Sequence, residues 1–214
     1  MPLQNRVDPF GRIHAVPERG MFTGNRGVIH DPETKTLLSR RWTTKAWLIC
    51  TCEYKGMRRE PMGRNARSGG AGWTELFFLD EPTALAAGHR PCFLCRRDAA
   101  LDYQRRLAGA LMLPDASAPE IDARLHRERL AVGVEARELD SGGLAGLPDG
   151  AMFAAGDTAY AVKGGKALAW SFAGYGEPRA LQDFQDRGLR LLTPATTVDI
   201  LKAGYRPAWH ATAA

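Results

Sequence analysis

Residues 74–97, TELFFLDEPTALAAGHRPCFLCRR, carry several structural signals in immediate succession. The apolar run in the first third of this stretch predicts a strand over 73–79. Asp80 is a suitable N-cap for a short helix over 81–87, and Gly88 is the residue type that most often ends a helix in the left-handed conformation. The stretch therefore predicts a strand, a tight turn into a helix, and a sharp exit from it.

The same stretch ends in a pair of cysteines with the spacing of a zinc knuckle. In Cys92-x-x-Cys95, two thiolates can bind one tetrahedral ion while the intervening backbone amides point at the sulfurs. Structural zinc takes four ligands, and a second pair, Cys50 and Cys52, lies upstream. We therefore expect one zinc ion held by these four thiolates.

The upstream pair leaves alternatives open. The residue pattern over 45–54 predicts a strand that would place both of its cysteines on one face. A gap of one residue is short for zinc, so His89 and His30 are reserve ligands if only one of Cys50 and Cys52 binds. The interpretation without a metal is that Cys50 and Cys52 are small apolar residues of a core strand.

Residues 74–97 resemble the second half of the N-terminal metal-binding domain of Ada-type methyl-phosphotriester DNA repair proteins. In that family a strand, a short helix ending in Ala-Gly-aromatic-Arg-Pro, and a Cys-x-x-Cys knuckle supply two zinc ligands. The resemblance covers roughly residues 45–98 and implies zinc ligation by Cys92 and Cys95, and by the upstream pair. It also implies a methyl-acceptor role for Cys50, although the family places three residues between its upstream cysteines and this chain places one.

Other catalytic motifs fit the sequence poorly. Zinc nucleobase deaminases carry the Pro-Cys-x-x-Cys string of residues 91–95, but they need His-x-Glu or Cys-x-Glu upstream of it. The match at residues 126–128, His-Arg-Glu, follows the knuckle instead. The chain contains no Gly-x-Ser-x-Gly, Walker loop or dinucleotide fingerprint. An enzyme would therefore be thiol- or metal-dependent, with Cys50 or Cys52 as the reactive thiolate.

Positive charge is concentrated in the first half of the chain. Residues 1–100 contain 16 Lys and Arg against 10 Asp and Glu, whereas residues 101–214 contain 13 against 14. Such a surface attracts polyanions by counterion release, and Trp42, Trp47 and Tyr54 are possible stacking surfaces. We therefore expect a nucleic-acid partner, DNA in a repair or regulatory setting being favoured. The expected phosphate contacts are Arg58, Arg59, Arg64, Arg67, Arg90, Arg96 and Arg97.

Composition limits the class of protein. Of the 214 residues, 44% are hydrophobic and 25% charged, which is enough apolar material for an ordinary core and excludes disorder of the whole chain. No apolar run approaches the roughly 20 residues of a membrane-spanning helix, and charges interrupt the first twenty residues, unlike a signal peptide. We expect a cytoplasmic protein with no membrane partner.

The predicted fold class is α+β, with short strands and helices around a zinc knuckle. A helical segment follows, and then a small antiparallel β-meander with a C-terminal helix. The predicted regions are a basic zinc-binding region over 1–112, a helical connector over 113–139 and a small α+β region over 140–214, or one continuous domain. Besides zinc and nucleic-acid binding, a zinc-stabilised protein-interaction module fits this layout.

Overall fold

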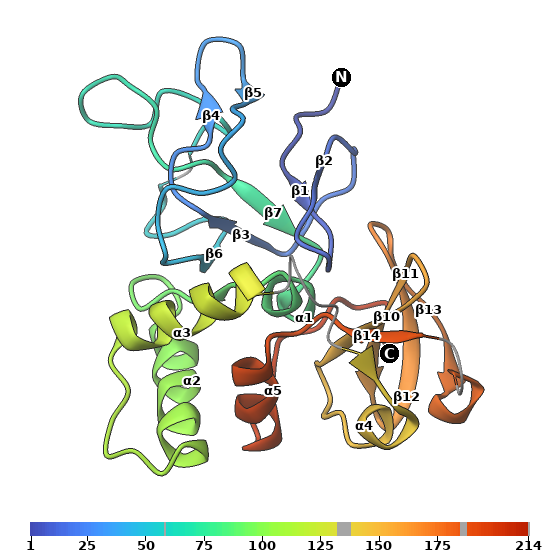
Figure 1. Ribbon diagram of the computed structural model, residues 1–214. Helices are drawn as coiled ribbons and strands as arrows, with labels where there is room; N and C mark the ends of the chain where they lie inside the picture. Colours follow the sequence, from blue (N-terminus) through green and yellow to red (C-terminus); the bar gives the residue numbers. More distant parts are fainter. Residues whose placement is uncertain (58, 132–137, 185–187, 214) are drawn as a thin grey trace.

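The computed structural model describes residues 1–57, 59–131, 138–184 and 188–213, and its fold is α+β (Figure 1). The helices of these residues are α1 (Glu81–Ala86), α2 (Arg97–Ala110), α3 (Ala118–Ala131), α4 (Ser141–Ala145) and α5 (Ala195–Lys202), with a short 3-10 helix at Leu181–Phe184. None of them is long and apolar enough to cross a membrane.

The N-terminal sheet is built from very short strands. In the described residues its order is β2-β1-β7-β3-β6-β8, with β1–β7 and β6–β8 parallel and the other neighbours antiparallel. The two strands expected from the sequence are confirmed as β6 and β7, each shorter than predicted. The strands are β1 (Arg6–Val7), β2 (Ile13–His14), β3 (Phe22–Asn25), β6 (Leu48–Thr51), β7 (Leu76–Phe78) and β8 (Arg90–Pro91), with a separate hairpin of β4 (His30–Asp31) and β5 (Thr36–Leu37).

Helix α1 follows β7 as predicted and is buried along its whole length. The Asp80 side chain accepts a hydrogen bond from the backbone N–H of Thr83 at 3.1 Å, which satisfies one of the free amides of the first turn. Gly88 has a φ of +82°, and a Cβ at this position would lie 2.8 Å from Cδ of Arg129. The glycine therefore allows both the turn out of α1 and the close approach of α3.

A single apolar cluster joins the sheet to the helices. It contains side chains from the N-terminal sheet, such as Ile49 and Leu76, from α2 and α3, and from α5 (Leu201). The hydroxyls of Tyr103 on α2 and Thr197 on α5 lie 2.9 Å apart inside it. All three regions predicted from the sequence thus contribute to the same core.

The last residues of the chain return to the start of α1. Glu81 accepts hydrogen bonds from the Tyr205 hydroxyl at 2.6 Å and from the Ala208 backbone at 2.9 Å. Asp80 accepts one from the backbone N–H of His210 at 3.2 Å. These buried acidic residues therefore fasten the C-terminal segment to the helix that precedes the cysteine knuckle.

The C-terminal sheet is antiparallel throughout, in the order β13-β12-β11-β10-β14-β9 for the described residues. The predicted meander is confirmed as β10–β12, and β13 extends it. Part of the predicted linker over 140–149 is instead α4, because Asp140 caps a short helix by accepting a hydrogen bond from the Gly143 amide at 2.6 Å. The strands are β9 (Glu138–Leu139), β10 (Met152–Ala155), β11 (Thr158–Lys163), β12 (Lys166–Ser171), β13 (Gly174–Ala180) and β14 (Leu189–Leu191).

Candidate metal centre

Strand pairing brings Cys50 next to Cys92. Strand β8 runs parallel to β6, and the backbone N–H of Cys92 donates a hydrogen bond to the carbonyl of Ile49 at 3.0 Å. Pro91 is tolerated in β8 because this strand lies at the edge of the sheet, where a missing N–H leaves no bond of the ladder unmade. The two cysteines therefore lie side by side where β6 and β8 end.

The knuckle then turns back on itself. The backbone N–H of Arg96 donates to the Cys92 carbonyl at 3.0 Å, and that of Leu94 donates to the Cys92 sulfur at 3.4 Å. This turn returns Cys95 to the same point, so that the Sγ atoms of Cys50, Cys92 and Cys95 all lie within 4.8 Å of one another. Three sulfurs this close can hold a metal ion.

The protonation of the three thiols is interdependent. Hydrogen bonds from the Cys50 and Cys95 thiols, together with backbone amides, lower the pKa of Cys92 to about 2. The hydrogen bond to Cys92 and burial raise the pKa of Cys50 far above its usual value. Adjacent negative charges repel, so sharing of protons among the three thiols is favoured. A divalent cation would replace those shared protons.

Cys52 is not part of this group of three. Strand β6 ends at Thr51, so the alternation that would have put Cys52 on the same face as Cys50 stops one residue too early. The Cys52 side chain is exposed, and its sulfur donates to the carbonyl of Met21 at 3.5 Å. Cys50, by contrast, is only 8% exposed.

Neither reserve histidine joins the cysteines. His89 is completely buried, with its ring centroid 5.1 Å from that of Trp47 and 4.6 Å from that of Phe78. His30 is also buried, and its Nδ1 lies 2.6 Å from the hydroxyl of Thr74. Both histidines are therefore held by packing and by hydrogen bonds elsewhere in the N-terminal half.

Three of the arginines expected to contact phosphates are engaged inside the protein. Arg90 is 4% exposed and forms two hydrogen bonds of 2.7 Å with the carboxylate of Asp122. Arg96 binds Glu81 in the same bidentate manner, at 2.7 and 2.9 Å. Arg59 is bound to the buried carboxylate of Glu75 at 2.6 Å. Their guanidinium groups are therefore bound to carboxylates of the protein itself.

The remaining arginines of that set lie at the surface or outside the described residues. Arg64, Arg67 and Arg97 are exposed, and Arg64 forms an ion pair with Glu33. Arg58 lies outside the described residues. The sequence contained no signal that separates these exposed arginines from the buried ones, because the partner carboxylates come from distant segments.

Comparisons with known proteins add no further information about this site. The chain matches no known protein family. No curated protein and no solved structure matches it either. Its function has to be argued from the arrangement of its residues.

Proposed function

We propose that the protein binds one structural zinc ion through Cys50, Cys92 and Cys95, with Cys52 as the fourth thiolate. The observation that carries this proposal is the convergence of three sulfurs within 4.8 Å on a Cys-x-x-Cys turn. Thiolate ligands favour zinc, copper(I) or iron–sulfur clusters, and tetrahedral sulfur coordination is typical of structural zinc. Because Cys52 lies outside this group in the structure, its ligation requires the bend that follows β6 to move.

The proposed role of the metal is to cross-link short elements. Strand β8 is two residues long, and the knuckle follows it directly before α2 begins. Such a strand gains little from its own hydrogen bonds, whereas a metal ion joins β6, the knuckle and the start of α2. A zinc ion here would therefore contribute directly to the free energy of folding.

Metal content tests this proposal. Protein purified without chelators should contain about one zinc per chain, and Cys92→Ser should lose it, because a hydroxyl does not replace a thiolate. Cys52→Ser tests the fourth ligand and should weaken the binding of zinc. Leu94→Ala is the matched control, since this side chain lies between the two knuckle cysteines and is 71% exposed. Absence of metal from the native protein would contradict the proposal.

A second function, nucleic-acid binding, is favoured by exposed basic and aromatic side chains in the N-terminal half. Arg40, Arg41 and Trp42 are consecutive exposed residues, a combination suited to phosphate contact and base stacking. Arg64 and Arg67 are further exposed arginines of the N-terminal half, although Arg64 is paired with Glu33. We propose DNA as the favoured polymer, in keeping with the resemblance to Ada-type proteins.

Salt dependence tests nucleic-acid binding. The logarithm of the binding constant should fall against the logarithm of salt concentration with a slope of about −3 to −6, because bound counterions are released. Replacing both Arg64 and Arg67 by Ala should reduce that slope by about 2. Arg105→Ala is the control, an exposed arginine paired with Asp102 on α2. Zinc-loaded protein that binds no nucleic acid at low salt would favour a protein-interaction module instead.

The resemblance to Ada-type proteins also implies a reaction, the transfer of a methyl group to Cys50. In that reaction the thiolate attacks the methyl carbon of a backbone phosphotriester, the carbon–oxygen bond breaks, and a phosphodiester is left. Because Cys50 is buried, transfer requires β6 to open toward the DNA. Intact mass after incubation with methylated DNA should show a gain of one methyl group, absent in Cys50→Ser. No gain while DNA is bound would confine the resemblance to the zinc scaffold.

A further inference from the structure

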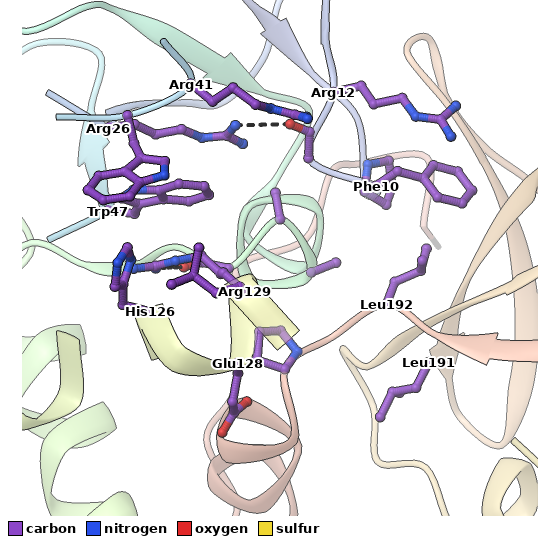
Figure 2. Close-up of a pocket in the computed structure, with 18 of the residues that line it drawn as sticks. Phe10, Arg12, Arg26, Arg41, Trp47, His126, Glu128, Arg129, Leu191 and Leu192 are labelled. Carbon is purple, nitrogen blue, oxygen red and sulfur yellow. Dashed lines mark hydrogen bonds between the residues drawn. The ribbon is translucent and has the colours of Figure 1, made fainter. Parts of the chain in front are cut away.

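A cavity of about 500 Å³ lies away from the cysteines, between the N-terminal sheet, the end of α1, helix α3 and the segment after β14 (Figure 2). Its charge is strongly unbalanced. Among the described residues that line it, arginines face a single carboxylate, that of Glu128. The arginines are Arg12, Arg26, Arg41, Arg129 and Arg190.

Arg26 is the most deeply buried of these side chains, at 2% exposed. Its Nη1 donates to the carbonyl of Gly11 at 2.9 Å, as Figure 2 shows, and its Nε lies 3.4 Å from Nε2 of His89. Its Nη2 has no hydrogen-bond partner in the described part of the chain. Burial, followed by the charges of Arg129 and Arg41, lowers the pKa of Arg26 to about 9. The protein thus keeps a guanidinium where its charge is poorly compensated.

Arg129 approaches the same tryptophan as Arg26. The two guanidinium carbons lie 4.2 Å and 4.1 Å from the ring centroid of Trp47. Two nitrogens of Arg129 donate to the carbonyls of Gly88 and Lys45, while its Nε has no partner among the residues described. Two cations therefore contact one indole ring.

Acidic residues near the cavity do not balance this charge. Within the described ranges, none of the five arginines forms an ion pair. The carboxylate of Glu128 accepts hydrogen bonds from the Thr196 backbone and hydroxyl, and that of Asp8 is 2.8 Å from Nε2 of His14. Arg26 and Arg129 each keep one buried nitrogen without a hydrogen-bond partner among the described residues, and an anion in the cavity would compensate their charge.

The shape and lining of the cavity indicate the class of anion. A planar guanidinium forms paired hydrogen bonds with phosphate oxygens, which a cluster of arginines can surround. The volume lies within the range of small-molecule sites and exceeds what a bare phosphate fills. Opposite Trp47 lie the apolar side chains of Phe10, Leu191 and Leu192, with Arg12 beside Phe10, as Figure 2 shows. A ligand that satisfies both walls carries a phosphate at one end and an apolar or aromatic group at the other.

We propose that this cavity binds a phosphate monoester. Arg26, Arg41 and Arg129 contact the phosphate, and the organic group packs against Phe10 and Leu192. The site shares no residue with the cysteine cluster, so the proposal goes beyond zinc binding and does not depend on it.

Calorimetric titration at low salt tests the site with inorganic phosphate, phenyl phosphate, adenosine 5′-monophosphate and adenosine. Phosphate should bind saturably, the two monoesters more tightly than phosphate, and adenosine not measurably. The test variant is Arg41→Ala, because its side chain is exposed and its loss leaves the core intact. It should weaken the binding of the monoesters about tenfold, since a charge-assisted hydrogen bond is lost. The control is Arg105→Ala, an exposed arginine of α2 outside the cavity, and should change affinity less than twofold.

Two outcomes overturn the proposal. One is folded protein that shows no saturable binding of either monoester up to about 10 mM, which is weaker than functional sites usually are. The other is an equal loss of affinity in the Arg105→Ala control, which would indicate diffuse surface attraction. A 5′-phosphorylated oligonucleotide and its unphosphorylated form distinguish the source of the phosphate. Preference for the phosphorylated oligonucleotide over the mononucleotide assigns the site to a nucleic-acid end, and the reverse preference to a small ligand.

Discussion

The two large sheets of this protein both pack on apolar clusters, but they differ in what else supports them. The N-terminal sheet has strands of two to four residues, and its surroundings contain the Arg90–Asp122 and Arg96–Glu81 ion pairs and the cysteine cluster. The C-terminal sheet has strands of up to seven residues and packs on an aromatic cluster. In that cluster the rings of Phe153 and Tyr160 are stacked 5.4 Å apart, and Phe184 lies edge-on to both.

Removal of the metal should therefore act mainly on the N-terminal sheet, and a cavity among the aromatic side chains mainly on the C-terminal sheet. Ion pairs and thiolates depend on pH and on chelators, whereas an antiparallel meander over aromatic side chains depends mainly on burial. Perturbations chosen to affect one type of force should therefore loosen one sheet and spare the other.

The largest effect is expected from removal of the metal. Chelation, or Cys92→Ser, should lower the free energy of unfolding by more than about 4 kcal/mol, because structural zinc contributes its binding energy to folding. Hydrogen exchange followed by mass spectrometry should show that β6, β8 and the start of α2 lose protection while β10–β12 keep theirs. Equal loss of protection in both sheets would contradict the expectation that the metal stabilises mainly the N-terminal sheet.

A cavity created by mutation in the aromatic cluster should destabilise the C-terminal sheet and leave the zinc site unchanged. Phe153 is completely buried, so Phe153→Ala should cost about 3 to 5 kcal/mol in urea unfolding. The zinc content of this variant should equal that of the wild type, because the cysteines pack elsewhere. The control is Met112→Ala, whose side chain is fully exposed and should contribute less than about 0.5 kcal/mol. Loss of zinc in Phe153→Ala would show that the sheets are coupled.

The smallest expected effect is a dependence of stability on pH that is caused by His89. Burial, followed by the charges of Arg26 and Arg129, holds the pKa of His89 well below its usual value. His89 takes up a proton near pH 6.5 in the unfolded chain but not in the folded one. The free energy of unfolding should therefore be unaffected by His89 above this pH and should decrease as the pH falls below it. The slope contributed by His89 reaches about 1.4 kcal/mol per pH unit.

Urea unfolding at pH 7, 6 and 5 measures this slope. His89→Gln should show a shallower decline than the wild type, and the difference between the two proteins separates His89 from the protonation of the cysteines. Parallel curves for the two proteins would be inconsistent with a neutral buried His89.

Local features of the knuckle could be predicted because their residues are consecutive. Asp80, Gly88 and the Cys-x-x-Cys pair each act on neighbouring backbone, and all three were read from the sequence. The position of Cys52 could not be predicted, because it depends on where β6 ends rather than on residue type. An alternation of two residues predicts a shared face only while the strand continues.

Charged residues were the least predictable, because their roles depend on partners that lie far along the chain. Arg90 resembles any surface arginine until Asp122 is placed beside it by α3. Arg26 and Arg129 belong to no sequence motif, and only the fold brings both of them into contact with Trp47. A count of basic residues therefore predicts an anionic partner but does not identify the side chains that would contact it.

The contacts between α1 and the C-terminal segment have a consequence for the order in which parts of the protein fold during synthesis. Asp80 and Glu81 are buried in the N-terminal half, but Tyr205, Ala208 and His210 supply several of their hydrogen bonds. Domains fold from the N-terminus as the ribosome releases them, and contacts between distant residues form late. We therefore expect helix α1 to gain these hydrogen bonds only after residues 205–210 have been synthesised.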